Sequence, residues 1–392
     1  MGLRHNKIWG IVFTIHSFIF SISTVDINAC TSAVISAEAS ASGRPMLWKH
    51  RDTSNTDNKV EYVAAHDGAL AYVALFNAQD TNLEEAWTGM NEAGFAIMNT
   101  ASYNIKDDNV PDKKMDKEGY VMTLALKSCR TINDFQHLLD TLPRPMGVEA
   151  NFGVIDSSGQ GAVFETNNHS YKRYDTSDTP GGTIIRTNYS HSGRPGEGYG
   201  YIREANAQVL LQPHIDNHDL TPAFLTETVS RSFYHDIHKC DDLNSGQQWL
   251  IDIDYIPRYK STATIVIEGI VPATDNEYST ADIINQYIMW TGLGYPPCTE
   301  IVPVWCHPSG VADGLRGLSG EGRSELCDIA KQRRAEVFSM RNGKDNNYIK
   351  VEKLTNPEGT GYLQTLVPHN LETYRIISHK RDNGQIKFES LR

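Results

Sequence analysis

The sequence predicts an α+β fold in which antiparallel sheets are covered by helices. Two observations lead to this prediction. Segments of β-type composition alternate in blocks with segments of helical periodicity, and two pairs of strand segments are joined by turn sequences. Hydrophobic residues make up 40% of the chain and charged residues 21%, a balance typical of a globular protein with a sizeable core.

The first predicted hairpin follows directly after residue 30. Residues 31–36 are rich in β-formers, residues 39–43 supply small residues and a glycine for a turn, and residues 46–50 resume an extended run. A second hairpin joins residues 152–156 to residues 162–165 through the loop Ser-Ser-Gly-Gln-Gly. Further strands are expected at residues 71–76, 95–99, 183–187 and 262–268.

Helical periodicity marks the remaining elements. Val121, Leu124, Ala125 and Cys129 can share one helix face, and Pro143 ends the helix that follows. The expected helices span residues 119–129, 132–142, 201–211, 222–235, 281–290 and 324–340.

The first 29 residues differ from the rest and predict a secretory signal or pro-segment that is removed. Arg4 and Lys7 precede an apolar run over residues 8–22, and a more polar stretch ends in the small residue Ala29. A membrane span needs about 20 apolar residues, and this run is shorter. We therefore expect the protein to be exported, to the periplasm or the extracellular space.

The organisation of the rest follows from composition. One domain is expected over residues 30–320, and residues 321–392 form a C-terminal extension packed on it, after a glycine-rich stretch. The formal net charge of −12 argues against a nucleic-acid partner, because binding to phosphates needs clustered Lys and Arg. The 6 cysteines are too few to hold the fold together, although export permits a disulfide, for which Cys298 and Cys306 are the best pair. Their spacing does not predict zinc.

Cys30 stands where signal cleavage is expected, directly after Ala29. Cleavage there would give a cysteine with both a thiol and a free α-amine. An α-amine titrates near pH 8, so it can act as general base for the neighbouring thiol. The position alone leaves three other roles open: a small buried apolar residue, a disulfide partner or a lipidated residue.

The sequence after Cys30 resembles the start of the N-terminal-nucleophile (Ntn) cysteine hydrolases, especially the penicillin acyltransferase and choloylglycine hydrolase group. Cys-Thr-Ser is followed by Gly-Arg-Pro-Met-Leu-Trp-Lys-His-Arg-Asp, where that group has a Gly-Arg-Asn-x-Asp type of segment. Aligned on its aspartate, Asp52 matches the family's Asp, Lys49 its Arg and His50 its Asn. Because lysine lacks the planar fork of arginine, Arg51 is a second candidate for the cation.

Three later blocks extend the resemblance. The segment at residues 87–99 resembles a family strand that ends in an oxyanion-hole asparagine; the match is Asn99, with Asn91 as the fallback. Such an amide contributes roughly 3–4 kcal/mol in comparable sites. Asn188 resembles an asparagine that lies near the nucleophile's amine, and Arg203 resembles a late active-site arginine.

The resemblance covers roughly residues 30–270. It implies a four-layer αββα sandwich and an enzyme that hydrolyses or transfers the acyl group of a small N-acyl amide, without metal or organic cofactor. The catalytic residues it implies are Cys30, Asp52, Asn99, Asn188 and Arg203, with Lys49, Arg51 and Asn91 as secondary candidates. The oligomeric state, including a homo-oligomer, stays open. Two alternatives remain: a cysteine dipeptidase of the same superfamily, and a non-catalytic lipoprotein lipidated at Cys30.

Overall fold

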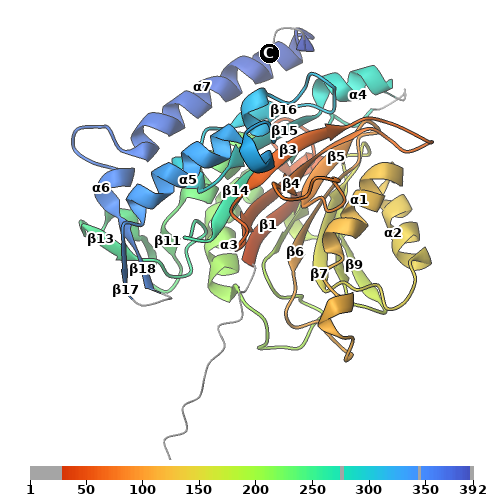
Figure 1. The fold of residues 1–392 in the computed structure, drawn as a ribbon, viewed down its shortest axis with the longest axis horizontal. Helices are drawn as coiled ribbons and strands as arrows, with labels where there is room; N and C mark the ends of the chain where they lie inside the picture. The colour runs from red at the N-terminus through yellow and green to blue at the C-terminus, as the bar shows by residue number, and fades with distance from the viewer. Residues whose placement is uncertain (1–28, 274–277, 343–345, 389–392) are drawn as a thin grey trace, which may run out of the picture.

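The computed structural model describes residues 29–273, 278–342 and 346–388. Within them, two large antiparallel sheets pack face to face and helices cover both outer faces (Figure 1). The predicted leader, apart from Ala29, lies outside the described residues. Over the described ranges, no helix combines the length and apolar character needed to cross a membrane.

The first sheet has six strands and contains the start of the described chain. Its strand order is β10-β1-β2-β14-β15-β16, and every neighbouring pair is antiparallel. The sheet is covered on both faces, so that every residue of the four central strands is buried. The strands are β10 (Thr183–Arg186), β1 (Ala29–Ile35), β2 (Met46–Asp52), β14 (Ser261–Glu268), β15 (Ile288–Leu293) and β16 (Val302–Val304).

The second sheet is a seven-stranded meander in which each strand pairs with the next one in the chain. Its central hairpin, β7–β8, is the one predicted around the Ser-Ser-Gly-Gln-Gly loop. The strands are β3 (Asn58–Val63), β4 (Tyr72–Asn77), β5 (Thr88–Asn91), β6 (Ala96–Ala101), β7 (Ala150–Ile155), β8 (Gly161–Thr166) and β9 (Tyr171–Asp175).

Three apolar clusters hold the layers together. Between the sheets, Val34 and Leu47 of the first pack with Met98 of the second. On the outer face of the second sheet, Phe135 of α2 (Ile132–Thr141) and Leu126 of α1 (Glu118–Ser128) complete another cluster. On the outer face of the first sheet lie α3 (Tyr201–Asn217) and the long α7 (Tyr362–Asp382). The predicted αββα order is confirmed (Figure 1).

Smaller elements close one end of the molecule. They surround a fourth apolar cluster that includes Phe233, Tyr255 and Phe338. These elements are α5 (Glu325–Val337), α6 (Val351–Leu354), the ribbon β11 (Tyr234–His235) and β12 (Cys240–Asp241), and the three-stranded sheet of β13 (Trp249–Ile251), β18 (Asn346–Lys350) and β17 (Met340–Asn342). The short helix α4 (Thr280–Gln286) lies apart from them, and its Ile283 packs in the cluster between the two large sheets (Figure 1).

Two predicted helices are wrong in part. Residues 222–235 form a π-helical turn (Phe224–Thr228), a 3-10 turn (Val229–Arg231) and then strand β11, and the Ser230 hydroxyl donates to the carbonyl oxygen of Leu225 at 2.8 Å. Over residues 281–290 the helix ends at Gln286, because Ile288 onward pairs with β14. In the second segment, pairing with β14 outweighs local helical periodicity, whereas in the first β11 forms a short ribbon with the neighbouring β12.

The disulfide expected between Cys298 and Cys306 does not form. All six cysteines are free. Cys298 packs in the fourth apolar cluster, whereas Cys306 packs between the two large sheets and donates its S–H to the carbonyl oxygen of Ala71 at 3.4 Å. The extended segment between them therefore carries the two thiols into different parts of the core.

Candidate active site

A cavity of about 590 Å³ opens beside β1, β2 and β6, and Cys30 lies on its wall. It gathers most of the residues that the sequence suggested. The predicted site residues on its lining are Cys30, Lys49, Arg51, Asp52 and Asn99. Asn188 and Arg203 form hydrogen bonds with the backbone of Cys30.

The pairing of β1 with β2 decides which side chains face the cavity. Cys30 lies directly opposite Arg51, and Ala29 lies opposite Asp52. Because side chains alternate along a strand, Cys30, Lys49 and Arg51 share the face toward the second sheet, and Asp52 projects from the other. Strand β2 ends in Lys-His-Arg-Asp, and all four of these residues are buried. Burying charged side chains costs folding free energy, so this sequence is unfavourable for a strand whose role is purely structural.

The backbone nitrogen of Cys30 is held by two residues from distant parts of the chain. It donates to Asn188 Oδ1 at 2.8 Å, and Arg203 Nη2 donates to the same oxygen at 2.8 Å. Arg203 Nη1 also donates to the Cys30 carbonyl oxygen at 2.6 Å and to Thr31 Oγ1 at 3.0 Å. Burial lowers the pKa of Arg203 to about 10, so the guanidinium stays charged at neutral pH. The predicted neighbourhood of Cys30, Asn188 and Arg203 is present.

Asn99 is oriented by Lys49. Lys49 Nζ donates to Asn99 Oδ1 at 2.7 Å and to the carbonyl oxygen of Trp87 at 2.5 Å. Because an ammonium group can only donate, it selects the amide oxygen and leaves the Asn99 amide N–H groups available for another acceptor. Burial lowers the pKa of Lys49 to about 7; a charge on Cys30 opposes this shift and Arg51 adds to it.

Asp52 is held by two residues that the sequence analysis did not identify. Arg258 donates to Asp52 Oδ2 through Nε at 3.0 Å and Nη2 at 2.7 Å, and the Ser261 hydroxyl donates to Oδ1 at 2.7 Å. Ser261 begins β14, one residue before the predicted strand, whereas no local pattern signals Arg258. His50 lies next to them and its Nε2 is 2.8 Å from Ser261 Oγ.

Arg51 is fixed by amides and an aromatic ring. Its Nη2 donates to Asn77 Oδ1 at 2.9 Å, its Nη1 donates to Asn58 Oδ1, and its guanidinium lies over the Trp87 ring, 5.1 Å from the centroid. Asn91, the fallback for the oxyanion role, lies outside the cavity lining. Its amide donates to two carbonyl oxygens around the end of α1 and its Oδ1 accepts from the turn before β6, so it holds that turn.

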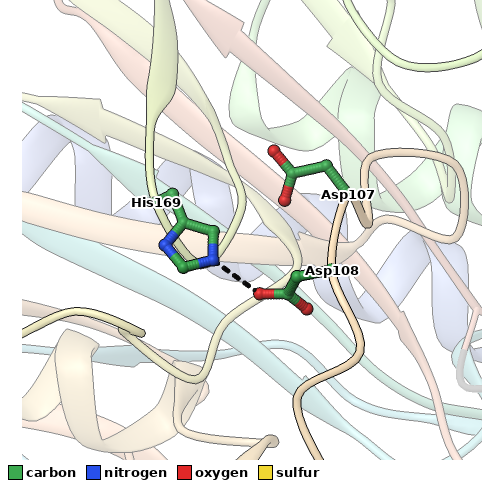
Figure 2. A group of neighbouring side chains, drawn as sticks. All are labelled: Asp107, Asp108 and His169. Carbon is green, nitrogen blue, oxygen red and sulfur yellow. Dashed lines mark hydrogen bonds and ion pairs between the residues drawn. The ribbon is translucent and has the colours of Figure 1, made fainter.

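One group of metal-type ligands occurs among the described residues, and Figure 2 shows it: Asp107, Asp108 and His169. His169 Nε2 lies 2.8 Å from Asp108 Oδ2. Asn168 donates to both oxygens of Asp108, and Asn167 donates to Asp107 at 2.9 Å. None of the three lines the cavity beside Cys30, and Asp107 Oδ2, both oxygens of Asp108 and His169 Nε2 already have partners, as in a surface network.

Three solved structures are similar to this chain at low identity. A Caenorhabditis elegans ortholog of N-acylethanolamine-hydrolyzing acid amidase is 14% identical, with a TM-score of 0.43, over 67% of this chain and 99% of its own. A mutant of the conjugated bile acid hydrolase from Clostridium perfringens is 11% identical, with a TM-score of 0.40, over 71% and 92%. Penicillin V acylase from Agrobacterium tumefaciens is 10% identical, with a TM-score of 0.34, over 70% and 86%.

No curated protein matches the chain. The model of one protein family, acyl-coenzyme A:6-aminopenicillanic acid acyl-transferase, matches residues 47–247, about half of the chain. The matched part contains Asp52, Asn99, Asn188 and Arg203, and Cys30 precedes it. The chain therefore belongs to the acyl-coenzyme A:6-aminopenicillanic acid acyl-transferase family, within the Ntn-hydrolase group.

Proposed function

We propose that the protein is an exported enzyme that cleaves linear amide C–N bonds, with Cys30 as its N-terminal nucleophile after removal of residues 1–29. The observation that carries this proposal is the position of the Cys30 nitrogen. In the full-length chain it is an amide nitrogen that donates to Asn188 Oδ1. Cleavage of the Ala29–Cys30 bond would turn it into an α-amine at the same place, beside the thiol that it has to deprotonate.

The surroundings suit an amine that works as a base. Buried Lys49, Arg51 and Arg203 disfavour a further positive charge on the amine and stabilise negative charge on the sulfur. Asp52, paired with Ala29 in the β-ladder, would become the carboxylate nearest the new chain end and would orient the amine once it is protonated. Arg258 and Ser261 hold that carboxylate in place.

The reaction would proceed in two acyl-transfer steps. The Cys30 sulfur attacks the amide carbonyl carbon while its proton passes to the α-amine, and Asn99 N–H stabilises the oxyanion together with a backbone N–H. The protonated amine then gives its proton to the leaving nitrogen as the C–N bond breaks. Water, or an acceptor amine, attacks the resulting thioester and restores the thiol.

The lipoprotein alternative fits the site less well. The Cys30 side chain is only 7% exposed and lies on a central strand against the cavity, so a diacylglyceryl group on its sulfur would have to fill the cavity. A dipeptidase differs from an acyl-amide hydrolase only in the substrate that the cavity accepts, so the substrate panel below separates the two.

The test is turnover by the purified protein on N-acyl amino acids, bile-acid conjugates, penicillins and dipeptides. We expect cleavage of at least one acyl-amide class and its complete loss in Cys30→Ala. Cys240→Ala is the matched control, because Cys240 is an exposed thiol outside the cavity, and it should stay active. Turnover retained by Cys30→Ala would exclude the proposed nucleophile, and cleavage of dipeptides alone would favour the dipeptidase.

A further inference from the structure

Two cations on the cavity wall are buried without a carboxylate partner. Lys49 is 2% and Arg51 4% exposed, and in the described part of the chain both donate only to amide and backbone carbonyl oxygens. Burying a charge is costly unless an opposite charge compensates for it. Three other buried arginines are compensated in this way: Arg186 by Glu165, Arg231 by Glu227 and Arg381 by Glu268.

Arg51 retains donors for a further acceptor. A guanidinium has five N–H groups, and Arg51 gives one to Asn58 and one to Asn77. The others have no acceptor among the described residues. The two amides and the Trp87 ring hold the guanidinium plane, so that little side-chain entropy is lost when a ligand binds. A planar guanidinium with N–H groups left over can donate them to a carboxylate, and this is one of the strong, charge-assisted pairs in proteins.

The register of β1 and β2 places this donor beside the nucleophile. Cys30 and Arg51 are directly opposite, and the Cβ atoms of such pairs lie about 4.5–5.5 Å apart on one face of a sheet. The Arg51 guanidinium also interacts electrostatically with Cys30, so an anion held by Arg51 lies on the same side of the sheet as the carbonyl carbon that Cys30 attacks. In an N-acyl α-amino acid, the carboxylate carbon is two bonds from the amide nitrogen, which suits this short separation.

The other lining side chains make the two ends of the cavity differ in electrostatic potential. Asp116, Glu118 and Glu149 also line it, with Lys106 Nζ 3.8 Å from Glu149 Oε1. Acidic groups disfavour an anion in their neighbourhood to the extent that they are ionised, and burial raises the pKa of Glu118 to about 7 and raises the pKa of Glu149 as well. Lys49 and Arg51, in contrast, attract an anion to the end near Cys30. A substrate with one carboxylate therefore has one favourable place for it.

We propose that Arg51 is an anion-binding residue of the substrate site, and that the amides cleaved carry a carboxylate next to the scissile nitrogen, as N-acyl α-amino acids do. This inference rests on the proposed function of Cys30, since it names the substrate class of that same cavity. Arg51 is a positioning and specificity residue in this account, and it takes no part in proton transfer.

The test compares N-phenylacetylglycine with N-phenylacetylglycinamide, which share the acyl group and differ in the carboxylate. Binding is measured by calorimetry to Cys30→Ala protein, which holds either compound without turning it over. We expect the acid to bind about 10- to 100-fold more tightly than the amide, the effect of one charged hydrogen-bonded pair. Arg51→Met in this background should bring the ratio close to one, Arg51→Lys should retain part of it, and Arg130→Met, on the exposed surface, should leave it intact.

Equal affinities for the acid and the amide in Cys30→Ala protein, including no measurable binding of both, would overturn the anion site. So would a ratio that survives in a folded Arg51→Met variant. If that variant does not fold, the ratio in Cys30→Ala protein alone decides. Failure of the wild-type protein to cleave any acyl amide, with the binding ratio present, would count against the proposed function and leave the anion site standing.

Discussion

Lys49 affects two of its neighbours, Asn99 and Cys30. It holds Asn99 by its amide oxygen, at 2.7 Å, and it places a charge close to Cys30. Where the enzymes that this sequence resembles have an arginine, which stays charged at any physiological pH, this chain has a lysine whose pKa burial lowers to about 7. The charge beside the nucleophile therefore depends on pH.

Lys49→Arg should alter the alkaline side of the pH profile. As the pH rises through about 7, Lys49 loses its proton, so that the cation that stabilises negative charge on Cys30 disappears. We expect kcat/KM of the wild-type enzyme to fall on this limb and the limb to move to higher pH in Lys49→Arg. The measurement is kcat/KM from pH 5.5 to 9.5 for both proteins. An alkaline limb at the same pH in both would show that Lys49 does not set it.

Asn99→Ala should lower kcat by about 100- to 1000-fold, because its amide N–H would donate to charge that develops only in the transition state. KM should change much less. Asn91→Ala is the control: that asparagine holds the turn before β6, so the variant should lose stability while its folded fraction keeps its kcat. A loss of less than tenfold in Asn99→Ala would withdraw the oxyanion role.

Strand β2 shows which features of the site could be predicted from the sequence. The turn expected at residues 39–43 and the extended run after it predict the strand, and the family resemblance suggests Lys49, Arg51 and Asp52 as site residues. What the strand's own sequence cannot show is which partners reach it. Arg258 contacts Asp52 from 206 residues away, and only the β2–β14 pairing brings them together.

His50 in β2 should make the protein acid-sensitive. The Ser261 hydroxyl uses its one O–H to donate a hydrogen bond to Asp52, so His50 Nε2 must donate to Ser261 Oγ. The buried Nδ1 of His50 has no partner in the described structure. Burial lowers the pKa of His50 from 6.5 to about 4. Between these values the unfolded chain binds the proton and the folded chain does not, so stability falls as the pH drops through this window.

His50→Gln keeps an N–H donor and cannot titrate. Between pH 7 and pH 4.5, the wild-type protein should lose about 2–3 kcal/mol more unfolding free energy than this variant. Urea unfolding at the two pH values measures the difference. Equal losses would mean that His50 takes up its proton over the same pH range in the folded and the unfolded chain, so that burial does not lower its pKa.

A buried ion pair joins the helix α7 to the sheet that carries Cys30. Arg381 of α7 donates to Glu268 Oε2 of β14 at 2.6 Å, and both side chains are almost completely buried. The fold class, the two hairpins and most central strands were predictable, because each follows from a local pattern. This pair was not, because its members lie 113 residues apart and no helix was predicted over the residues of α7.

Arg381→Met should destabilise the protein by about 3–5 kcal/mol, because Glu268 would be left as a buried charge without its partner. Arg381→Met combined with Glu268→Gln should recover much of that loss, since the remaining amide is neutral. Thermal or denaturant unfolding of the wild-type protein, the single variant and the double variant measures the loss of stability and its recovery. Equal stabilities of the single and double variants would show that the buried charge is not the cause.

The central claim is that Cys30 becomes the first residue of the active enzyme. Mass spectrometry of the N-terminal peptide, from active protein expressed as the full 392-residue chain, tests it directly. The account predicts a chain that begins at an unmodified Cys30, because only then is the nitrogen beside Asn188 an amine. A fully active protein that keeps Ala29, or one whose Cys30 carries a diacylglyceryl group, would contradict it.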